Sequence, residues 1–113
     1  MKWIQISKTD NFPLREGRCV TIGGDDVAVF NLGERFLAVD NACPHRGGPL
    51  CDGIVSGETV ICPLHNYKIS LETGEVLKPE LPVRVQTYLT RVENGILMIA
   101  VPVNKEMDKE MAA

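Results

Sequence analysis

Both histidines of the chain lie shortly after a cysteine, in two short motifs. Cys43-Pro-His45 is separated by sixteen residues from Cys62-Pro-Leu-His65. The motifs supply two thiolates and two imidazoles, which are side chains that bind soft and borderline transition metals. We therefore expect Cys43, His45, Cys62 and His65 to hold one metal centre, with two ligands from each motif.

Two kinds of centre use this donor set. A structural zinc ion takes two cysteines and two histidines in a tetrahedron. A [2Fe–2S] cluster takes two cysteines on one iron and two histidines on the other. The usual zinc finger places both cysteines before both histidines and its histidines on a helix, whereas this chain has the order Cys-His, Cys-His among predicted strands. The order favours the iron–sulfur cluster, and zinc is the alternative.

The residues around the two motifs resemble the Rieske family. The similar stretch runs Cys-Pro-His-Arg-Gly-Gly-Pro-Leu-Cys-Asp-Gly, then Cys-Pro-Leu-His-Asn-Tyr, then Leu-Glu-Thr-Gly, within about residues 40–79. The resemblance implies one [2Fe–2S] cluster per chain, with Cys43 and Cys62 on one iron and His45 and His65 on the other, exposed iron. It also implies a function in one-electron transfer.

The motifs differ from those of the high-potential Rieske proteins of respiratory complexes, which carry one further cysteine in each ligand loop and join the two in a disulfide. This chain has Cys51 after the first motif but no cysteine after Cys62, so that bridge is not expected. Asn66-Tyr67 stands where those proteins have a serine hydroxyl donor. Both differences predict a midpoint potential below about +100 mV, within a Rieske range of roughly −150 to +300 mV.

Among low-potential Rieske proteins, the motifs look most like those of the small subunit of assimilatory NAD(P)H-dependent nitrite reductase. The resemblance implies a large partner with flavin, a further iron–sulfur cluster and sirohaem, on which nitrite is reduced to ammonia. The chain itself is expected to have no catalytic residue, and it lacks a glycine-rich dinucleotide fingerprint. The alternative is a free-standing Rieske ferredoxin that carries electrons from a ferredoxin reductase to an aromatic-ring dioxygenase. A third hypothesis has no redox function: a β-domain that acts as a binding module and is stabilised by a structural zinc ion.

The rest of the chain predicts an all-β domain that positions the two ligand loops. Short alternating segments separated by Gly and Asn turns indicate strands. They are expected at 3–7, 18–22, 27–30, 35–39, 54–55, 59–61, 67–71, 76–77, 81–90 and 96–101. We expect a Rieske-type antiparallel sandwich or barrel, as one domain over 1–103, followed by a polar tail at 104–113.

Composition and charge argue against several other classes of protein. The net charge of −3 disfavours nucleic-acid binding, which needs a basic face. No apolar run approaches the roughly 18 residues of a membrane helix, and the N-terminus lacks the apolar stretch of a signal peptide, so a cytoplasmic location is expected. In that compartment structural disulfides are not expected. We expect Cys19 to be buried in its strand and Cys51 to pack under the first loop, with a redox role for Cys51 less favoured.

Overall fold

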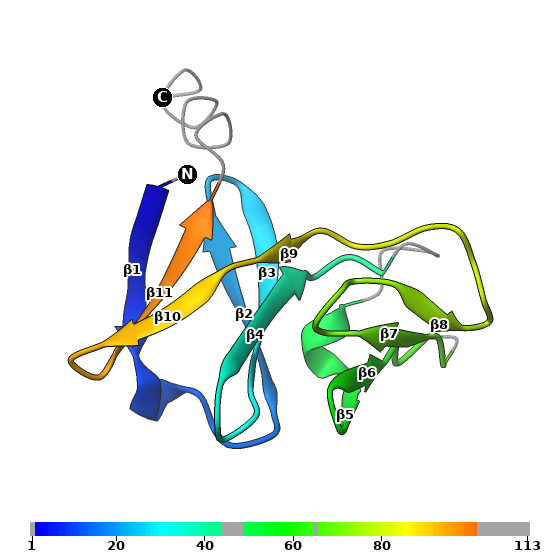
Figure 1. The fold of residues 1–113 in the computed structure, drawn as a ribbon, viewed down its shortest axis with the longest axis horizontal. Coiled ribbons are helices and arrows are strands. Elements are labelled where there is room, and N and C mark those ends of the chain that lie inside the picture. The colour runs from blue at the N-terminus through cyan, green and yellow to red at the C-terminus, as the bar shows by residue number, and fades with distance from the viewer. Residues whose placement is uncertain (1, 44–48, 65, 102–113) are drawn as a thin grey trace.

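The chain forms a base of two antiparallel sheets and a smaller lobe with a third sheet (Figure 1). The computed structural model describes residues 2–43, 49–64 and 66–101. The predicted tail at 104–113 lies outside them. Within the described residues no helix is long and apolar enough to cross a membrane. The all-β prediction is confirmed.

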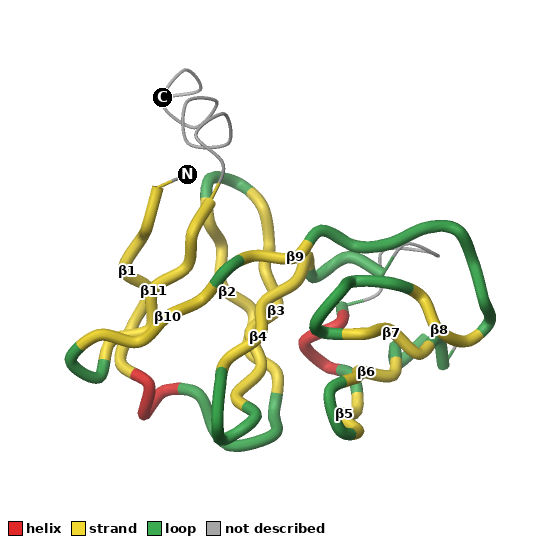
Figure 2. Tube along the Cα trace, viewed as in Figure 1, coloured by secondary structure: helices red, strands yellow, loops and turns green. Residues whose placement is uncertain are grey.

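Seven strands make the base and four make the lobe. The first base sheet has the order β1 (Lys2–Lys8), β11 (Ile96–Val101), β10 (Thr90–Glu93). The second has the order β2 (Gly17–Ile22), β3 (Asp25–Asn31), β4 (Phe36–Asp40), β9 (Thr87–Tyr88). The lobe sheet has the order β5 (Ile54–Ser56), β6 (Thr59–Ile61), β7 (Lys68–Ser70), β8 (Val76–Lys78). Two short 3-10 turns, η1 (Thr9–Asn11) and η2 (Leu50–Asp52), join strands, and loops make up much of the lobe (Figure 2).

Tight glycine turns set the hairpins of the base. Gly23 and Gly24 join β2 to β3 with φ of 59° and 85°, and Asn94 and Gly95 join β10 to β11 with φ of 53° and 76°. Two consecutive residues with positive φ give the turn whose twist matches the flanking strands, and Gly and Asn adopt that conformation most easily. Both hairpins are confirmed.

β3 lies between the two hydrophobic cores of the molecule. Val27 and Val29 point into the core between the two base sheets, whereas Ala28 and Phe30 point into a second core shared with the lobe. All four side chains are fully buried. Complete burial of a valine or phenylalanine side chain stabilises the fold by roughly 1.5–3 kcal/mol. The lobe therefore packs on the base and shares a hydrophobic core with it.

Arginines add polar links between base and lobe. The Arg35 guanidinium, in the turn between β3 and β4, contacts the carboxylate of Glu58 and lies 3.4 Å from that of Glu72. Its hydrogen bond to Glu58 raises the pKa of Arg35. Arg15 donates to the carbonyl of Gly57 at 3.3 Å. Because these groups are exposed, each link is weak, and together they orient two lobe turns against the base.

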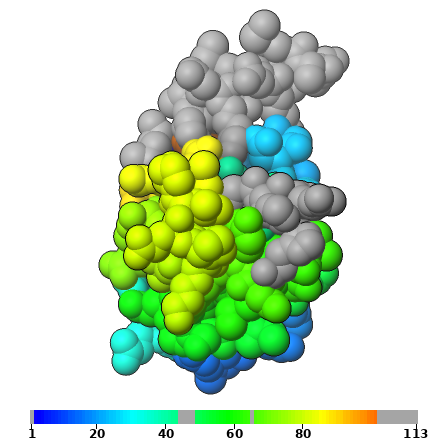
Figure 3. Space-filling view, turned by 90° about the vertical axis from the view of Figure 1, so that its right-hand side faces the viewer, coloured from blue at the N-terminus to red at the C-terminus, as the bar shows by residue number. Residues whose placement is uncertain are grey.

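The return from lobe to base differs from the prediction. The prediction of one strand over residues 81–90 is wrong: Thr87–Tyr88 and the start of β10 pair there, and Arg84 forms a single antiparallel bridge with Glu75. Pro79 and Pro82 lack the N–H that a sheet ladder needs. The connection 79–86 instead runs over the outer face of the lobe (yellow in Figure 3) and is held by the Val85 amide, which donates to the Gly74 carbonyl at 2.9 Å.

Candidate metal centre

The first motif begins at a stem, the short paired segment where the two ends of its loop meet. β4 ends at Asp40, and Ala42 forms an antiparallel bridge with Pro49. Asn41 holds the returning chain twice, because its carbonyl accepts from the Leu50 amide and its side-chain oxygen accepts from the Cys51 amide, both at 2.8 Å. Cys43 is the first residue after this bridge, so the stem fixes where its thiol starts.

The second motif begins at a similar stem. The Cys62 amide donates to the Tyr67 carbonyl at 2.8 Å, which continues the β6–β7 hairpin by one pair. The Asn66 amide donates back to the Cys62 carbonyl at 3.1 Å. This tight return needs φ of 58° at Asn66, a conformation that asparagine tolerates better than most residues. Cys62 is thus fixed at the end of a strand.

Both cysteines are buried in the same apolar cluster. Cys43 is 3% exposed and Cys62 is 1% exposed, and the cluster also contains Leu50, Val60 and Ile69. Apolar surroundings disfavour a bare thiolate, whereas a bound metal stabilises it. A pair of shielded sulfur ligands from two separate loops therefore fits the inner, cysteine-bound iron of a [2Fe–2S] cluster.

The two predicted histidine ligands, His45 and His65, lie outside the described residues. The structure thus brings Cys43 and Cys62 into one cluster, and ligation by all four residues stays a prediction. Among residues 2–43, 49–64 and 66–101, no three or more Cys, His, Asp or Glu side chains gather where they could hold a metal ion.

Exposed leucines on the lobe were missed by sequence reasoning. Leu64, next to the ligand position 65, is 55% exposed, and Leu77 in β8 is 40% exposed. Leu77, Leu81 and Pro82 line a shallow hollow of about 440 Å³ with two glutamates at its sides. The sequence did contain a signal for this exposure, because Leu64 is an apolar residue between the predicted ligands Cys62 and His65.

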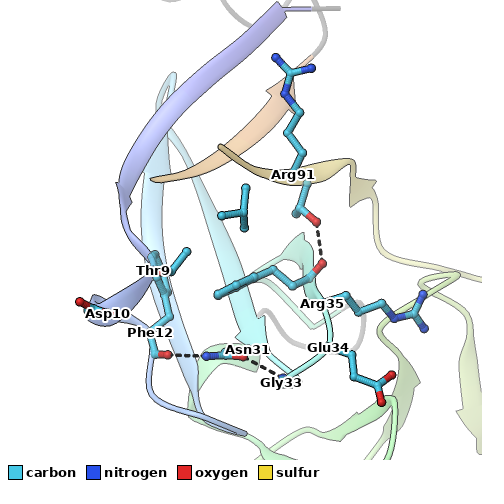
Figure 4. Close-up of a pocket in the computed structure, with 11 residues that line it drawn as sticks. Thr9, Asp10, Phe12, Asn31, Gly33, Glu34, Arg35 and Arg91 are labelled. Carbon is cyan, nitrogen blue, oxygen red and sulfur yellow. Dashed lines mark hydrogen bonds between the residues drawn. The ribbon is translucent and has the colours of Figure 1, made fainter. Parts of the chain in front are cut away.

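Another hollow lies in the base. It measures about 630 Å³ and is formed by η1, β4, β10 and the turns beside them (Figure 4). Asn31 spans its floor, donating to the Phe12 carbonyl at 2.7 Å and accepting from the Gly33 amide at 2.8 Å. None of its lining residues is a cysteine, so it is separate from the predicted centre.

The other two cysteines also lie among the described residues. Cys19 is exposed, so the prediction that it is buried is wrong. The reason is that β2 is an edge strand: Val20 and Ile22 pack into the base core, and Cys19 faces the opposite side. Cys51 is half-buried and packs against the apolar cluster that contains Cys43 and Cys62, and its predicted packing under the first loop stays a prediction because residues 44–48 lie outside the described residues.

Comparisons with known proteins identify the family of the chain. Residues 2–100 match the family model of the Rieske-like [2Fe-2S] domain. The ferredoxin subunit of a 3-phenylpropionate/cinnamic acid dioxygenase from Shigella flexneri is 34% identical over 89 residues, which cover 77% of this chain and 84% of that protein. The ferredoxin component of the naphthalene 1,2-dioxygenase/salicylate 5-hydroxylase systems of Ralstonia sp is 29% identical over 97 residues, covering 86% and 93%.

A solved structure extends the comparison to a second functional group. The protein assigned as an NADH-dependent nitrite reductase small subunit from Mycobacterium tuberculosis superposes with a TM-score of 0.82. It is 28% identical, and the match covers 89% of this chain and 96% of that one. Proteins similar to this chain therefore occur in both groups that the sequence resembles.

Proposed function

Because the chain belongs to the family of Rieske-like [2Fe-2S] domains, we propose that Cys43, His45, Cys62 and His65 are the ligands of its cluster. The protein is a Rieske electron-transfer protein, and its cofactor is a Rieske-type [2Fe–2S] cluster. When bound, such a cluster supplies reversible one-electron chemistry. The burial of Cys43 and Cys62 in one apolar cluster is the observation that carries the ligand assignment.

The chain's own residues would act by fixing and shielding the ligands. The stems at Asn41 and at Tyr67 hold the ends of the two loops together, which limits how far the ligands can move between redox states. Leu50 and Val60, both fully buried, keep water away from the cysteine side. A rigid, dry environment suits rapid electron transfer because little has to rearrange when charge changes.

The physiological role proposed here is that of the small subunit of a cytoplasmic NAD(P)H-dependent nitrite reductase. Two observations support it. The second motif continues as Asn-Tyr-Lys-Ile-Ser-Leu-Glu-Thr-Gly-Glu, which resembles such subunits, and the Mycobacterium tuberculosis protein matches almost end to end. The chain would relay electrons within a complex whose large flavin- and sirohaem-containing subunit reduces nitrite to ammonia.

The second candidate is a Rieske ferredoxin that serves a dioxygenase. The curated relatives from Shigella flexneri and Ralstonia sp favour it, because each is a ferredoxin component matched over most of its own length. In this role the chain would dock in turn on a reductase and on an oxygenase, and both contacts would be short-lived and small.

In either role the exposed leucines of the lobe would meet the partner. Leu64 and Leu77 present apolar surface on the same lobe as the two ligand loops, where a partner can approach the centre. The variants Leu64→Glu and Leu77→Glu should weaken partner binding. Val92→Glu is the matched control, because Val92 is 46% exposed but lies on β10 in the base.

The deciding experiment is affinity purification of the tagged chain from its native cells grown on nitrate, followed by mass spectrometry. Stable, stoichiometric recovery of a large flavoprotein with nitrite reductase activity supports the first role, and loss of that complex in Leu64→Glu but not Val92→Glu supports the docking surface. A chain that purifies alone and passes electrons to a dioxygenase in a reconstituted assay overturns the first role in favour of the second.

A further inference from the structure

Two cysteines that the cluster does not use, Cys19 and Cys51, lie side by side next to the stem of the first ligand loop. Gly17, two residues before Cys19, touches the Cys51 backbone: a Cβ placed on Gly17 would lie 2.4 Å from the Cys51 carbonyl oxygen and 2.8 Å from its Cα. Side chains alternate along a strand, so Gly17 and Cys19 face the same side of β2. Cys19 therefore lies on the face of β2 that packs against Cys51, and each thiol is close enough to affect the pKa of the other.

Small molecules can reach this pair. Cys19 is exposed and Cys51 is half-buried. Cys51 lines a surface hollow of about 390 Å³ together with Gly17, Arg18 and Asp52. The Cys51 thiol also lies 3.9 Å from a carboxylate oxygen of Asp52. Proximity and access are two of the conditions for oxidation of a dithiol, and the fraction of thiolate is the third.

We propose that Cys19 and Cys51 form a reversible disulfide, with hydrogen peroxide or a similar neutral hydroperoxide as the oxidant. One thiolate attacks the peroxide, the O–O bond breaks, and a sulfenic acid forms as water leaves. The second thiolate then attacks the sulfenic sulfur, an S–S bond forms, and a second water leaves. The two sulfurs supply the two electrons that reduce one peroxide, and the thiol protons end in the two waters. A dithiol reductant reverses the change.

The electrostatic surroundings set how readily the pair reacts. Burial, then the charge of Asp52 and the neighbouring Cys19, raise the pKa of Cys51 to about 11. Burial and the charge of Asp26 raise the pKa of Cys19. Arg18, which lines the same hollow, lies 3.8 Å from the Glu16 carboxylate and so is partly neutralised. Since only the thiolate attacks, the pair is slow to oxidise at neutral pH, and the carboxylates repel anionic oxidants.

The disulfide would act on the first ligand loop through its stem. Cys51 follows Leu50 in η2, and the amides of both residues are held by Asn41, two residues before Cys43. A covalent bond from Cys51 to β2 would tie this stem to the base sheet. The oxidised form should therefore retain its cluster at higher temperature than the reduced form.

The test is peptide mapping of the cluster-containing protein after prolonged treatment with one equivalent of hydrogen peroxide at about pH 9, where the thiolate fraction is higher than at neutral pH. The expected result is a Cys19–Cys51 linked peptide that disappears with dithiothreitol, together with a rise on the order of 10 °C in the midpoint of thermal cluster loss. Cys19→Ser and Cys51→Ser should each lack both effects. Two unlinked, alkylatable thiols after peroxide, a link between two chains, or an unchanged midpoint would overturn the proposal.

The rate of linkage gives a second readout that does not depend on the cluster. Below the pKa of the attacking thiol, the rate of disulfide formation should rise nearly tenfold per pH unit, because the fraction of thiolate rises by the same factor. Asp52→Asn should react several-fold faster at a fixed pH, and Asp10→Asn, in η1 of the base, should react like the parent protein. A rate independent of pH, or equal in Asp52→Asn and the parent, would contradict the assigned chemistry.

Discussion

Replacing Gly74 with alanine tests the packing of the lobe against its return connection. Gly74 has φ of +82°, and a Cβ there would lie 2.1 Å from the carbonyl oxygen of Val85. The same glycine accepts the hydrogen bond from the Val85 amide at 2.9 Å. An alanine must therefore adopt a strained conformation and also push the connection away from the turn.

The size of the effect follows from these two costs. A non-glycine residue in the left-handed region costs about 1–2 kcal/mol, and forcing packed backbone apart costs about 1–3 kcal/mol more. Gly57→Ala is the matched control, because Gly57 has φ of +60° in another lobe turn and its Cβ would meet no described atom within 4 Å. Gly57→Ala should therefore show only the first cost.

For a domain of 113 residues, 1 kcal/mol corresponds to about 4 °C in the unfolding midpoint. Gly74→Ala should thus lose its cluster about 4–12 °C below Gly57→Ala. The assay is visible absorption of the anaerobic protein during heating, at one scan rate because cluster loss is irreversible. Equal midpoints for the two variants would refute the contact between Gly74 and Val85.

Three further outcomes are expected. Tyr88→Phe should destabilise the protein by roughly 1.5–3 kcal/mol, because it removes the 2.6 Å bond that the hydroxyl donates to Asp40 just before the first loop. Burial and Asp40 raise the pKa of Tyr88, so the folded protein keeps the tyrosine proton at a pH where the unfolded chain loses it. The stability of the parent should therefore fall above about pH 10, and that of Tyr88→Phe should fall less. Thermal melting from about pH 8 to 11 measures this difference. Arg35→Gln should lower the midpoint less than Gly74→Ala, since its ion pairs are exposed; a larger loss would contradict this. Redox titration should give a midpoint below about +100 mV, because the second ligand loop has no cysteine after Cys62 that could form a disulfide with the first loop, and a higher value would refute the low-potential assignment.

Local chemistry explains which parts of the fold could be predicted from sequence. The glycine and asparagine turns at 23–24 and 94–95 require positive φ, so their hairpins follow from residue type alone. Cys43 and Cys62 were predicted from their spacing to the histidines, and their burial in one cluster agrees. These features depend on residues close together in the chain.

The parts that could not be predicted depend on distant neighbours. Residues 81–90 have strand-like composition, but whether they pair depends on where the Gly74 turn holds Val85. Cys19 alternates with Val20 like a half-buried strand residue, and only the edge position of β2 exposes it. β2 also packs against Cys51, which lies 32 positions after Cys19, and no local pattern could indicate that packing.

The central claim is that Cys43, His45, Cys62 and His65 hold a [2Fe–2S] cluster. Pulsed EPR of the dithionite-reduced protein tests it most directly, because it detects nitrogen nuclei coupled to the iron spin. The parent protein should contain two irons and two sulfides per chain and show couplings from two histidine nitrogens. His45→Cys and His65→Cys should each remove one coupling wherever a cluster is retained. A colourless protein with one zinc ion, or a cluster without nitrogen coupling, would contradict the account.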